Sequence, residues 1–228
     1  MTVAAVILAA SASRAVADAA GVSRVRRIAD AAWSGGAMPI IVVAPDPDGT
    51  VAVALSGASV TLIGPAPSES GPVGQIVRGI QTAAAEISDV TAALVWPARL
   101  CWVGPETVTS LVEAHGATPD VMIRPAYHDE AGWPALVPIT ALAALRGLAT
   151  AAMPDDLLDE LIETGLTLRV IDLGDPGTVI DGDTERAGLP PYEGPSEPLG
   201  AHEWGSMAAA TPEDAPLEAP SSIGSDTH

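Results

Sequence analysis

The sequence contains no lysine and no phenylalanine, so all ten of its Lys and Arg residues are arginine. Without lysine, a Schiff base, a phosphate-loop lysine and a lysine acid–base step are all excluded. Aromatic residues make up only 3% of the chain. A buried core must therefore be built mainly from Ala, Val, Ile and Leu.

Positive charge is scarce as well. Asp and Glu outnumber Lys and Arg by 29 to 10, which gives a formal net charge of −19. A protein this acidic repels the phosphates of nucleic acids and anionic lipids, so we expect neither nucleic acid nor a membrane as a partner. The single cysteine, Cys101, excludes an intramolecular disulfide and a cysteine-rich zinc site.

Long hydrophobic runs are also missing. The apolar run Val3–Ala10 is far shorter than the ~20 residues that cross a bilayer. It has no basic residue before it and is short for the hydrophobic segment of a secretion signal. We therefore predict that it is a buried first strand, and that the protein is cytoplasmic.

What the sequence does contain is an alternation of buried strands and amphipathic helices. Continuous apolar runs predict strands over Val3–Ala9, Pro39–Ala44, Ser59–Ile63, Val90–Trp96, Asp120–Arg124 and Leu166–Leu173. Apolar periodicity and terminal signals predict helices over Ser23–Trp33, Pro72–Ile87, Pro105–His115 and Asp155–Glu163. This order is typical of a three-layer, Rossmann-like α/β domain with a mainly parallel sheet and helices on both faces. We assign residues 1–187 to this domain.

Residues 188–228 have a different composition, with seven prolines, several serines and glycines, and scattered acidic residues. Such a segment buries too little apolar surface to offset its ordering entropy, so we predict an acidic, disordered tail. Tyr192 and His202–Trp204 (HEW) stand out within it. They are incidental, or pack on the domain surface, or form a short motif that docks a protein partner.

Ligands of open α/β sheets bind beyond the carboxyl ends of the strands, and the first strand is followed by Leu8–Arg14 (LAASASR). This segment resembles the opening signature of the MobA-like nucleotidyltransferases of molybdenum cofactor, which have a GT-A-like fold. Ser11 stands where the family has a glycine, a residue that allows close approach of the backbone to phosphates. The resemblance implies a nucleotide-binding role for Ala9, Ala10, Ser11, Ser13 and Arg14.

The family also places a phosphate-contacting lysine a few residues further on, and this sequence has none. Arg24, Arg26 and Arg27 lie in that neighbourhood. Because a guanidinium fork suits phosphate oxygens, Arg24 and Arg27 are candidate nucleotide-binding residues. The alternative is exposed helix charge that balances nearby acidic residues.

The segment Gly71–Ile80 (GPVGQIVRGI) resembles the family's loop and helix start that contact the base and the ribose. Gln75 stands in the place of the usual serine. The resemblance implies that Gly71, Gly74 and Gln75 bind the nucleotide. A capped core helix without a ligand is an equal alternative.

The segment Trp96–Thr107 resembles the family element that carries a metal-binding aspartate. Alignment on Pro105 puts Arg99 at the position of that aspartate, which in the family coordinates the Mg²⁺ that bridges the triphosphate. A guanidinium has a fixed positive charge and cannot coordinate a cation. Arg99 is therefore expected to contact a phosphate or to pair with Asp181 or Asp183, and with Arg14 it is a candidate catalytic residue.

Two later segments complete the resemblance. Gly132–Val137 (GWPALV) is similar to a family motif that has histidine at the position of Trp133, and Val179–Thr184 (VIDGDT) is similar to its closing motif. In the family the closing acidic pair helps to hold the metal, and alternate residues of an extended segment share a face. Asp181 and Asp183 are thus the candidate Mg²⁺ ligands. The alternative is a turn whose aspartates cap the next helical step.

The resemblance implies transfer of a nucleotide from CTP or GTP to a phosphorylated, molybdopterin-type acceptor, with release of pyrophosphate. The loop glycine, the lysine and the metal-binding aspartate are all replaced, so we expect catalysis to be reduced or lost. One alternative is a non-catalytic nucleotide-binding or accessory protein of molybdoenzyme maturation. A weaker one is a GT-A-type sugar transferase, which would need a pair of aspartates separated by one residue after a strand near the middle of the sequence, and none is found there.

Overall fold

Small and β-branched apolar residues form the strand at the centre of the sheet, β1 (Thr2–Leu8), whose five inner residues are buried. In the computed structural model, β1 pairs in parallel with β4 (Ile40–Val43) on one side and with β6 (Val90–Pro97) on the other. β5 (Thr61–Ile63) continues the parallel order beyond β4. Parallel strands buried on both faces need continuous apolar residues, and this is the pattern from which they were predicted.

The other half of the sheet contains an antiparallel strand. β9 (Ala135–Pro138) lies between β6 and β7 (Met122–Tyr127) and runs antiparallel to both. β10 (Leu168–Asp172) pairs in parallel with β7, and the short β8 (Glu130–Ala131) pairs with β7 in the antiparallel sense. Within residues 2–195, eight strands form one mixed, mostly parallel sheet.

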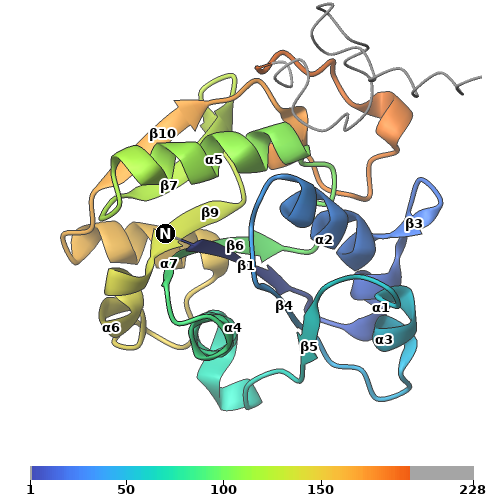
Figure 1. Ribbon diagram of the computed structural model, residues 1–228, viewed down its shortest axis with the longest axis horizontal. Helices are drawn as coiled ribbons and strands as arrows, with labels where there is room; N and C mark the ends of the chain where they lie inside the picture. Colours follow the sequence, from blue (N-terminus) through green and yellow to red (C-terminus); the bar gives the residue numbers. More distant parts are fainter. Residues whose placement is uncertain (1, 196–228) are drawn as a thin grey trace, which may run out of the picture. The chain divides into compact units, whose positions relative to one another are not determined.

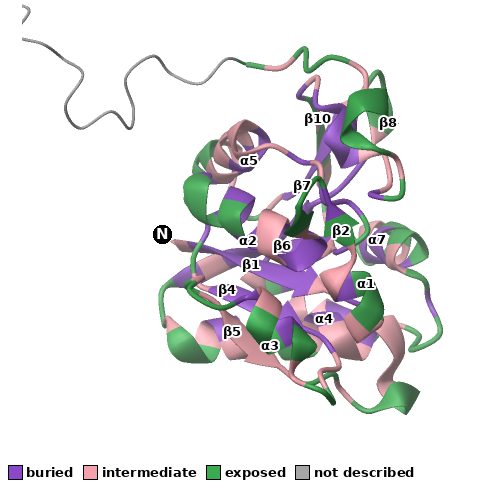
Figure 2. Ribbon diagram, turned by 90° about the vertical axis from the view of Figure 1, so that its right-hand side faces the viewer, coloured by how far each residue is buried: buried purple, intermediate pink, exposed green. Residues whose placement is uncertain are grey.

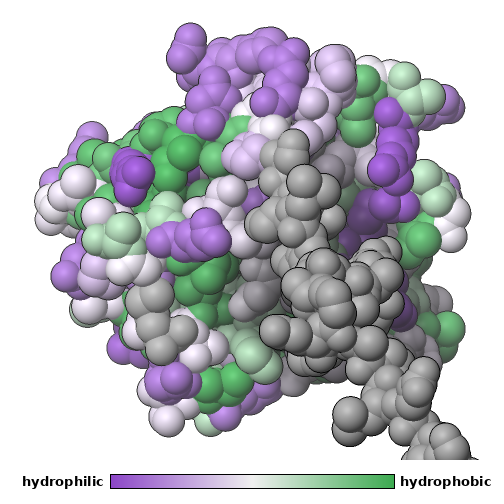
Figure 3. Space-filling model, turned by 45° about the horizontal axis from the view of Figure 1, so that its top comes forward, coloured by the Kyte–Doolittle hydropathy of each residue, from purple (hydrophilic) through white to green (hydrophobic). Residues whose placement is uncertain are grey.

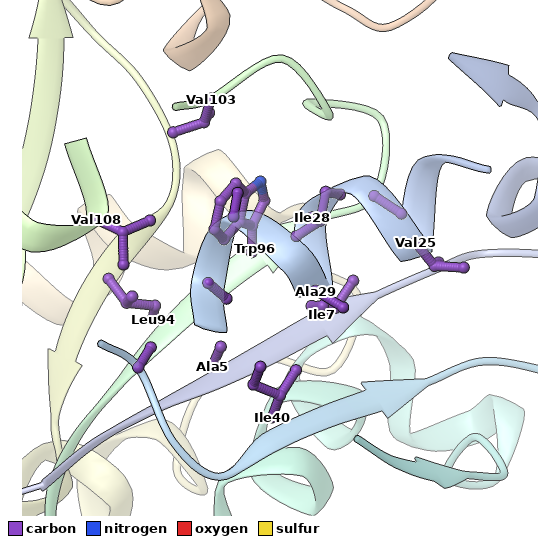
Figure 4. Close-up of a cluster of buried hydrophobic side chains, with 14 of the residues drawn as sticks. Ala5, Ile7, Val25, Ile28, Ala29, Ile40, Leu94, Trp96, Val103 and Val108 are labelled. Carbon is purple, nitrogen blue, oxygen red and sulfur yellow. The ribbon is translucent and has the colours of Figure 1, made fainter. Parts of the chain in front are cut away.

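One face of the sheet is covered by α2 (Arg24–Ser34) and α5 (Pro105–Ala117), as Figure 1 shows. Apolar side chains of these helices meet those of the strands in a buried cluster that includes Ile7, Ile28 and Trp96. In Figure 4 the indole ring of Trp96 lies beside Ile28, between the strands and α2. In a protein without phenylalanine, Trp96 is the largest fully buried side chain among the described residues.

The opposite face is covered by α4 (Gly71–Glu86), α6 (Leu142–Leu145) and α7 (Pro154–Glu163). Side chains alternate along a strand, so Val6 of β1 points to this side. Figure 2 shows that burial is highest in the strands between the two helical layers. The predicted three-layer α/β architecture is confirmed.

Several short elements complete the described part of the fold: α1 (Ala12–Val16), β2 (Asp18–Ala19), β3 (Val22–Ser23) and α3 (Thr50–Ala54). Every strand and helix predicted from the sequence overlaps an observed one. The elements that were not predicted, β9 and α6 among them, have five residues or fewer.

The structure describes residues 2–195, which belong to one compact unit ending at Pro195. Most of the predicted tail, including His202 and Trp204, lies outside the described residues. Glu193 is part of the compact unit, since its backbone N–H donates to the carbonyl of Gly174 over 2.8 Å. Among residues 2–195, no helix is both long enough and apolar enough to cross a bilayer.

Candidate functional site

The carboxyl ends of β1, β4 and β6 open into a cavity of about 860 Å³, which we call the strand-end cavity. The strand register sets Leu8 beside Val43 and Pro97, so the three strands end at the same level. Apolar residues line one part of the cavity: Leu8, Val43, Pro45, Pro65, Ala66 and Pro72. Charged residues line another: Arg14, Arg99, Asp155, Asp181 and Asp183.

The predicted site residues divide into two groups around this cavity. Those that line it are Ala9, Ala10, Arg14, Gly71, Gln75, Arg99, Asp181 and Asp183. Those that lie outside its lining are Ser11, Ser13, Arg24, Arg27 and Gly74. The cavity thus brings together residues from the beginning, the middle and the end of the domain.

The loop after β1 accommodates Ser11 in the place of the family's glycine. Ser11 has φ −153° and ψ 157°, an extended conformation that any residue adopts. Its Oγ accepts a hydrogen bond from the backbone N–H of Arg14 over 3.2 Å and lies 3.0 Å from Ser13 Oγ. Ser11 therefore acts as the N-cap of α1, and the serine side chain has a structural partner of its own.

At the start of α4, a glycine and a glutamine shape the cavity wall. Gly71 has φ +57°, and a Cβ there would overlap the carbonyl group of Thr150. Gln75 makes two hydrogen bonds to the backbone of Ala66: Oε1 accepts over 2.7 Å and Nε2 donates over 3.1 Å. The amide of Gln75 thus holds the neighbouring loop in position.

Arginine side chains surround the carboxylate of Asp183. Arg24 Nη2 donates to Asp183 Oδ1 over 2.6 Å, and Arg14 Nη1 donates to Oδ2 over 3.3 Å. The hydrogen bond and the charge of Arg24 are the main reasons why the pKa of Asp183 lies below its usual value. Asp183 is therefore ionised at neutral pH.

Asp181 lies between two arginines in the same way. Its Oδ1 is 3.8 Å from Arg24 Nη1, and its Oδ2 is 3.8 Å from Arg99 Nη1. The backbone ties the same region together, because Gly182 N–H donates to the carbonyl of Arg99 over 2.6 Å. Residues 179–184, which we call the closing loop, are thus bonded to the loop that carries Arg99.

The pairing continues from Arg99 to residues that the sequence analysis did not select. Arg99 Nη2 lies 3.9 Å from Asp155 Oδ2, and Asp155 Oδ1 accepts from Arg124 Nη2 over 3.4 Å and from Trp133 Nε1 over 2.9 Å. Burial lowers the pKa of Arg124, whose guanidinium lies over the Trp133 ring. One feature of the sequence indicated that Arg124 has a buried partner: it lies inside the apolar run that forms β7.

We call this series of ion pairs the arginine–aspartate network. Its members are Arg14, Arg24, Arg99, Arg124, Asp155, Asp181 and Asp183. The order alternates, so each aspartate lies between two arginines. Part of the network is exposed, with side-chain exposures of 59% for Arg14 and 45% for Arg99, whereas Arg24 is 4% exposed.

The three arginines at the start of α2 lie in three different places. Arg24 belongs to the network, whereas Arg26 pairs with Asp30 over 2.8 Å. Arg27 donates to the carbonyl of Ala19 and lies over the Trp102 ring, beside a second cavity of about 610 Å³. Successive positions on a helix point in different directions, so the cluster in the sequence is not a cluster in space.

Asp181 and Asp183 are the candidate metal ligands that the sequence suggested. Within residues 2–195, no group of three or more His, Cys, Asp or Glu side chains is arranged to hold a metal ion. Both aspartates instead have arginine neighbours on each of their carboxylate oxygens.

Solved structures with the same fold include several nucleotidyltransferases. A nucleotidyl transferase from Methanothermobacter thermautotroptrophicus is 20% identical, with a TM-score of 0.60 over 75% of this chain and 87% of its own. The Rv0371c protein of Mycobacterium tuberculosis, solved with manganese, is 18% identical, with a TM-score of 0.56 over 75% and 89%. The 2-C-methyl-D-erythritol 4-phosphate cytidylyltransferase of Thermus thermophilus is 16% identical, with a TM-score of 0.58 over 82% and 95%.

At these identities the likeness establishes the fold alone. A search of curated protein sequences gave no match. The sequence profile of one family, described as the MobA-like NTP transferase domain, matches residues 5–164. The match includes the second half of β1, the loop that follows it, α4 and Arg99. The chain therefore belongs to the family of MobA-like NTP transferase domains.

Proposed function

We propose that this protein binds a nucleoside triphosphate, CTP or GTP, in the strand-end cavity, and that its nucleotidyl transfer to a phosphorylated acceptor is reduced or lost. The observation that carries the proposal is the environment of Arg99. Its guanidinium lies between Asp181 and Asp155 at the carboxyl end of β6. In the resemblance described above, this is the position of the metal-binding aspartate.

The lining of the cavity supports nucleotide binding. Its apolar part, between the ends of β1 and β4 and the start of α4, has the chemistry that suits a base and a ribose. Arg14 and Arg99 lie at the charged part, and guanidinium forks bind phosphate oxygens well. Nucleotidyltransferases of the same fold, a cytidylyltransferase among them, support the same assignment.

The residues present do not fit the Mg²⁺ that the family uses. Two carboxylates, Asp181 and Asp183, are available, and arginine nitrogens lie within 3.8 Å of all four of their oxygens. A divalent cation would have to displace positive charge before it reached them. Loss of one group that stabilises charge in the transfer step costs about 10²–10³ in rate, which supports a reduced or absent transfer reaction.

For the acceptor, we propose the molybdopterin-type phosphate that the family resemblance implies. Beyond Arg99, the cavity continues along Met153, Pro154 and Asp155 at the start of α7. The acceptor phosphate would meet Arg99 there. In this assignment the protein acts in molybdoenzyme maturation, as a slow transferase or as a nucleotide-binding accessory protein.

Two measurements test the proposal. Calorimetric titration with CTP and with GTP is expected to give saturable binding of one of them, weakened at least tenfold by Arg14→Gln and unchanged by Arg146→Gln at an exposed control position. Pyrophosphate release with the bound nucleotide, Mg²⁺ and molybdopterin is expected to be slow or at background. Rapid turnover that Asp181→Ala abolishes would contradict reduced catalysis, and absence of binding would contradict the nucleotide site.

A further inference from the structure

Arg24 is a buried cation directly beneath the closing loop. Its side chain is 4% exposed, and it is the first residue of α2. Its Nη2 reaches Asp183, whereas Nε and Nη1 find no hydrogen-bond acceptor among the described residues. A buried guanidinium with unsatisfied donors is costly, so its charge must be compensated by the two carboxylates above it.

The four carboxylate oxygens of the closing loop have one arginine nitrogen each. From below the loop, Arg24 Nη1 lies 3.8 Å from Asp181 Oδ1 and Arg24 Nη2 lies 2.6 Å from Asp183 Oδ1. From the side of the cavity, Arg99 Nη1 lies 3.8 Å from Asp181 Oδ2 and Arg14 Nη1 lies 3.3 Å from Asp183 Oδ2. Arg99 also pairs with Asp155, which in turn pairs with Arg124, so the whole network has four arginines and three aspartates and is net positive by one charge.

Gly182 of the closing loop packs closely against Arg24 and Cys101. A Cβ at Gly182 would lie 3.1 Å from Arg24 Cζ and 2.6 Å from Cys101 Sγ. The backbone N–H of Gly182 is bonded to Arg99 as described above. Arg24 is thus held in the interior beneath the closing loop, whereas Asp181 and Asp183 are 36% and 67% exposed and reach the cavity.

From this geometry we propose that Arg24 is a built-in counter-cation of the site, and that the cavity takes the nucleoside polyphosphate free of Mg²⁺. The inference rests on the proposed nucleotide binding and specifies the form of the ligand. Arg24 holds Asp181 and Asp183 from below, which leaves Arg14 and Arg99 to turn toward the phosphates. The uncomplexed polyphosphate carries two more negative charges than its Mg²⁺ complex, so it is attracted more strongly to these arginines.

The first test is a nucleotide titration in EDTA and in excess Mg²⁺, with CTP and GTP as probes. We expect Mg²⁺ to weaken binding several-fold in the wild type. Arg99→Asp is expected to reverse the sign of the Mg²⁺ effect, because it adds a third carboxylate and removes the cation beside Asp181. Arg146→Asp makes the same charge change at an exposed position and should behave as the wild type does.

The second test uses Mn²⁺ alone and needs no nucleotide. Electron paramagnetic resonance measures the bound Mn²⁺. The wild type is expected to bind no more Mn²⁺ than the Asp181→Asn variant does, whereas the Arg99→Asp variant is expected to bind one additional ion. Arg24→Met is expected to melt at a lower temperature than the wild type in EDTA and to be stabilised by Mn²⁺. If Arg24→Met does not fold, Arg99→Asp alone decides the question.

The outcomes separate the two proposals. Nucleotide binding that requires Mg²⁺ would overturn the inference and leave the proposed function intact. Absence of nucleotide binding in both buffers would overturn the proposed function. A Mn²⁺ ion that the wild type binds and Asp181→Asn loses would overturn the role of Arg24 on its own.

Discussion

Arginine carries all of the fixed positive side-chain charge in this protein, and four of the ten arginines belong to the arginine–aspartate network. Arg14 and Arg99 are exposed enough to reorient, while Arg24 and Arg124 are held in the protein interior by their neighbours. Exposed ion pairs contribute little to stability, so Arg14 and Arg99 lose little when they exchange a carboxylate for a phosphate. The same arginines can therefore pair with aspartates in the absence of a ligand and bind phosphates when a nucleotide is present.

A second buried titratable group lies away from the cavity. His115 of α5 is fully buried, and its Nε2 lies 2.9 Å from Thr91 Oγ1. Burial lowers the pKa of His115 below its ordinary value of 6.5. His115 therefore binds a proton less readily in the folded protein than in the unfolded polypeptide.

This gives a stability prediction with a definite sign. The contribution of neutral His115 is fully present above pH 6.5 and is lost as the pH falls from there toward the lower folded pKa. The melting temperature of the wild type should fall between pH 7 and pH 5, and that of His115→Gln should fall less. Thermal denaturation at several pH values measures this, and equal slopes for the two proteins would contradict it.

At the scale of the elements, local sequence patterns were sufficient to predict the main strands and helices. Continuous apolar runs identified β1, β4 and β6, and Pro72 with its apolar period identified α4. β9 was not predicted, because its short apolar run follows Pro134 and ends on Pro138, and prolines argue against a central strand. The order of the strands in the sheet could be read only from the tertiary structure.

The candidate site was predictable only in part, for the same reason. Motif resemblance identified Arg14, Arg99, Asp181 and Asp183 as candidates, and all four line the cavity. The partner of Asp183, Arg24, is 159 positions away in the sequence. Its place near the family's lysine made Arg24 a candidate nucleotide-binding residue, which stays a prediction, and its observed contacts are with the two aspartates. Pairings over such distances leave no trace in a single sequence.

The contact between α4 and the sheet gives a prediction about one glycine. A Cβ at Gly79 would overlap Val6 Cγ1 and lie 3.2 Å from Val43 Cγ2. Overpacking of this kind costs about 1–3 kcal/mol, so Gly79→Ala should lower the free energy of unfolding by about that amount. Urea denaturation measures it. Helix propensity alone predicts the opposite, a gain of about 1 kcal/mol, and such a gain would contradict the packing argument.

At the scale of the whole molecule, a core of mainly small and branched apolar side chains lies within a strongly acidic protein. Figure 3 shows hydrophilic and hydrophobic side chains in small alternating groups on the face that it presents. With a net charge of −19, the surface favours solubility and opposes association with anionic partners. An arginine cluster within such a protein has a clear electrostatic contrast with its surroundings, which favours it as the place where an anion binds.

The end of the compact unit can be tested by truncation. Tyr192 lines the second cavity and its hydroxyl donates to the carbonyl of Pro195 over 3.1 Å, while Glu193 lies 3.2 Å from His128 in addition to its bond to Gly174. A protein ending at residue 195 should keep the melting temperature of the full protein. One ending at residue 187 loses these contacts, worth about 1–2 kcal/mol, and should melt about 2–8 °C lower. Equal melting temperatures for the two truncations would contradict this boundary.

The most direct test of the account is a crystal structure with CTP or GTP bound in the absence of divalent cations. It should reveal the phosphates against Arg14 and Arg99, the base between the ends of β1 and β4, and Arg24 still bonded to Asp183. The contradicting result is a structure grown with Mg²⁺ in which the ion is coordinated by Asp181 and Asp183 beside the triphosphate, with Arg24 displaced from both.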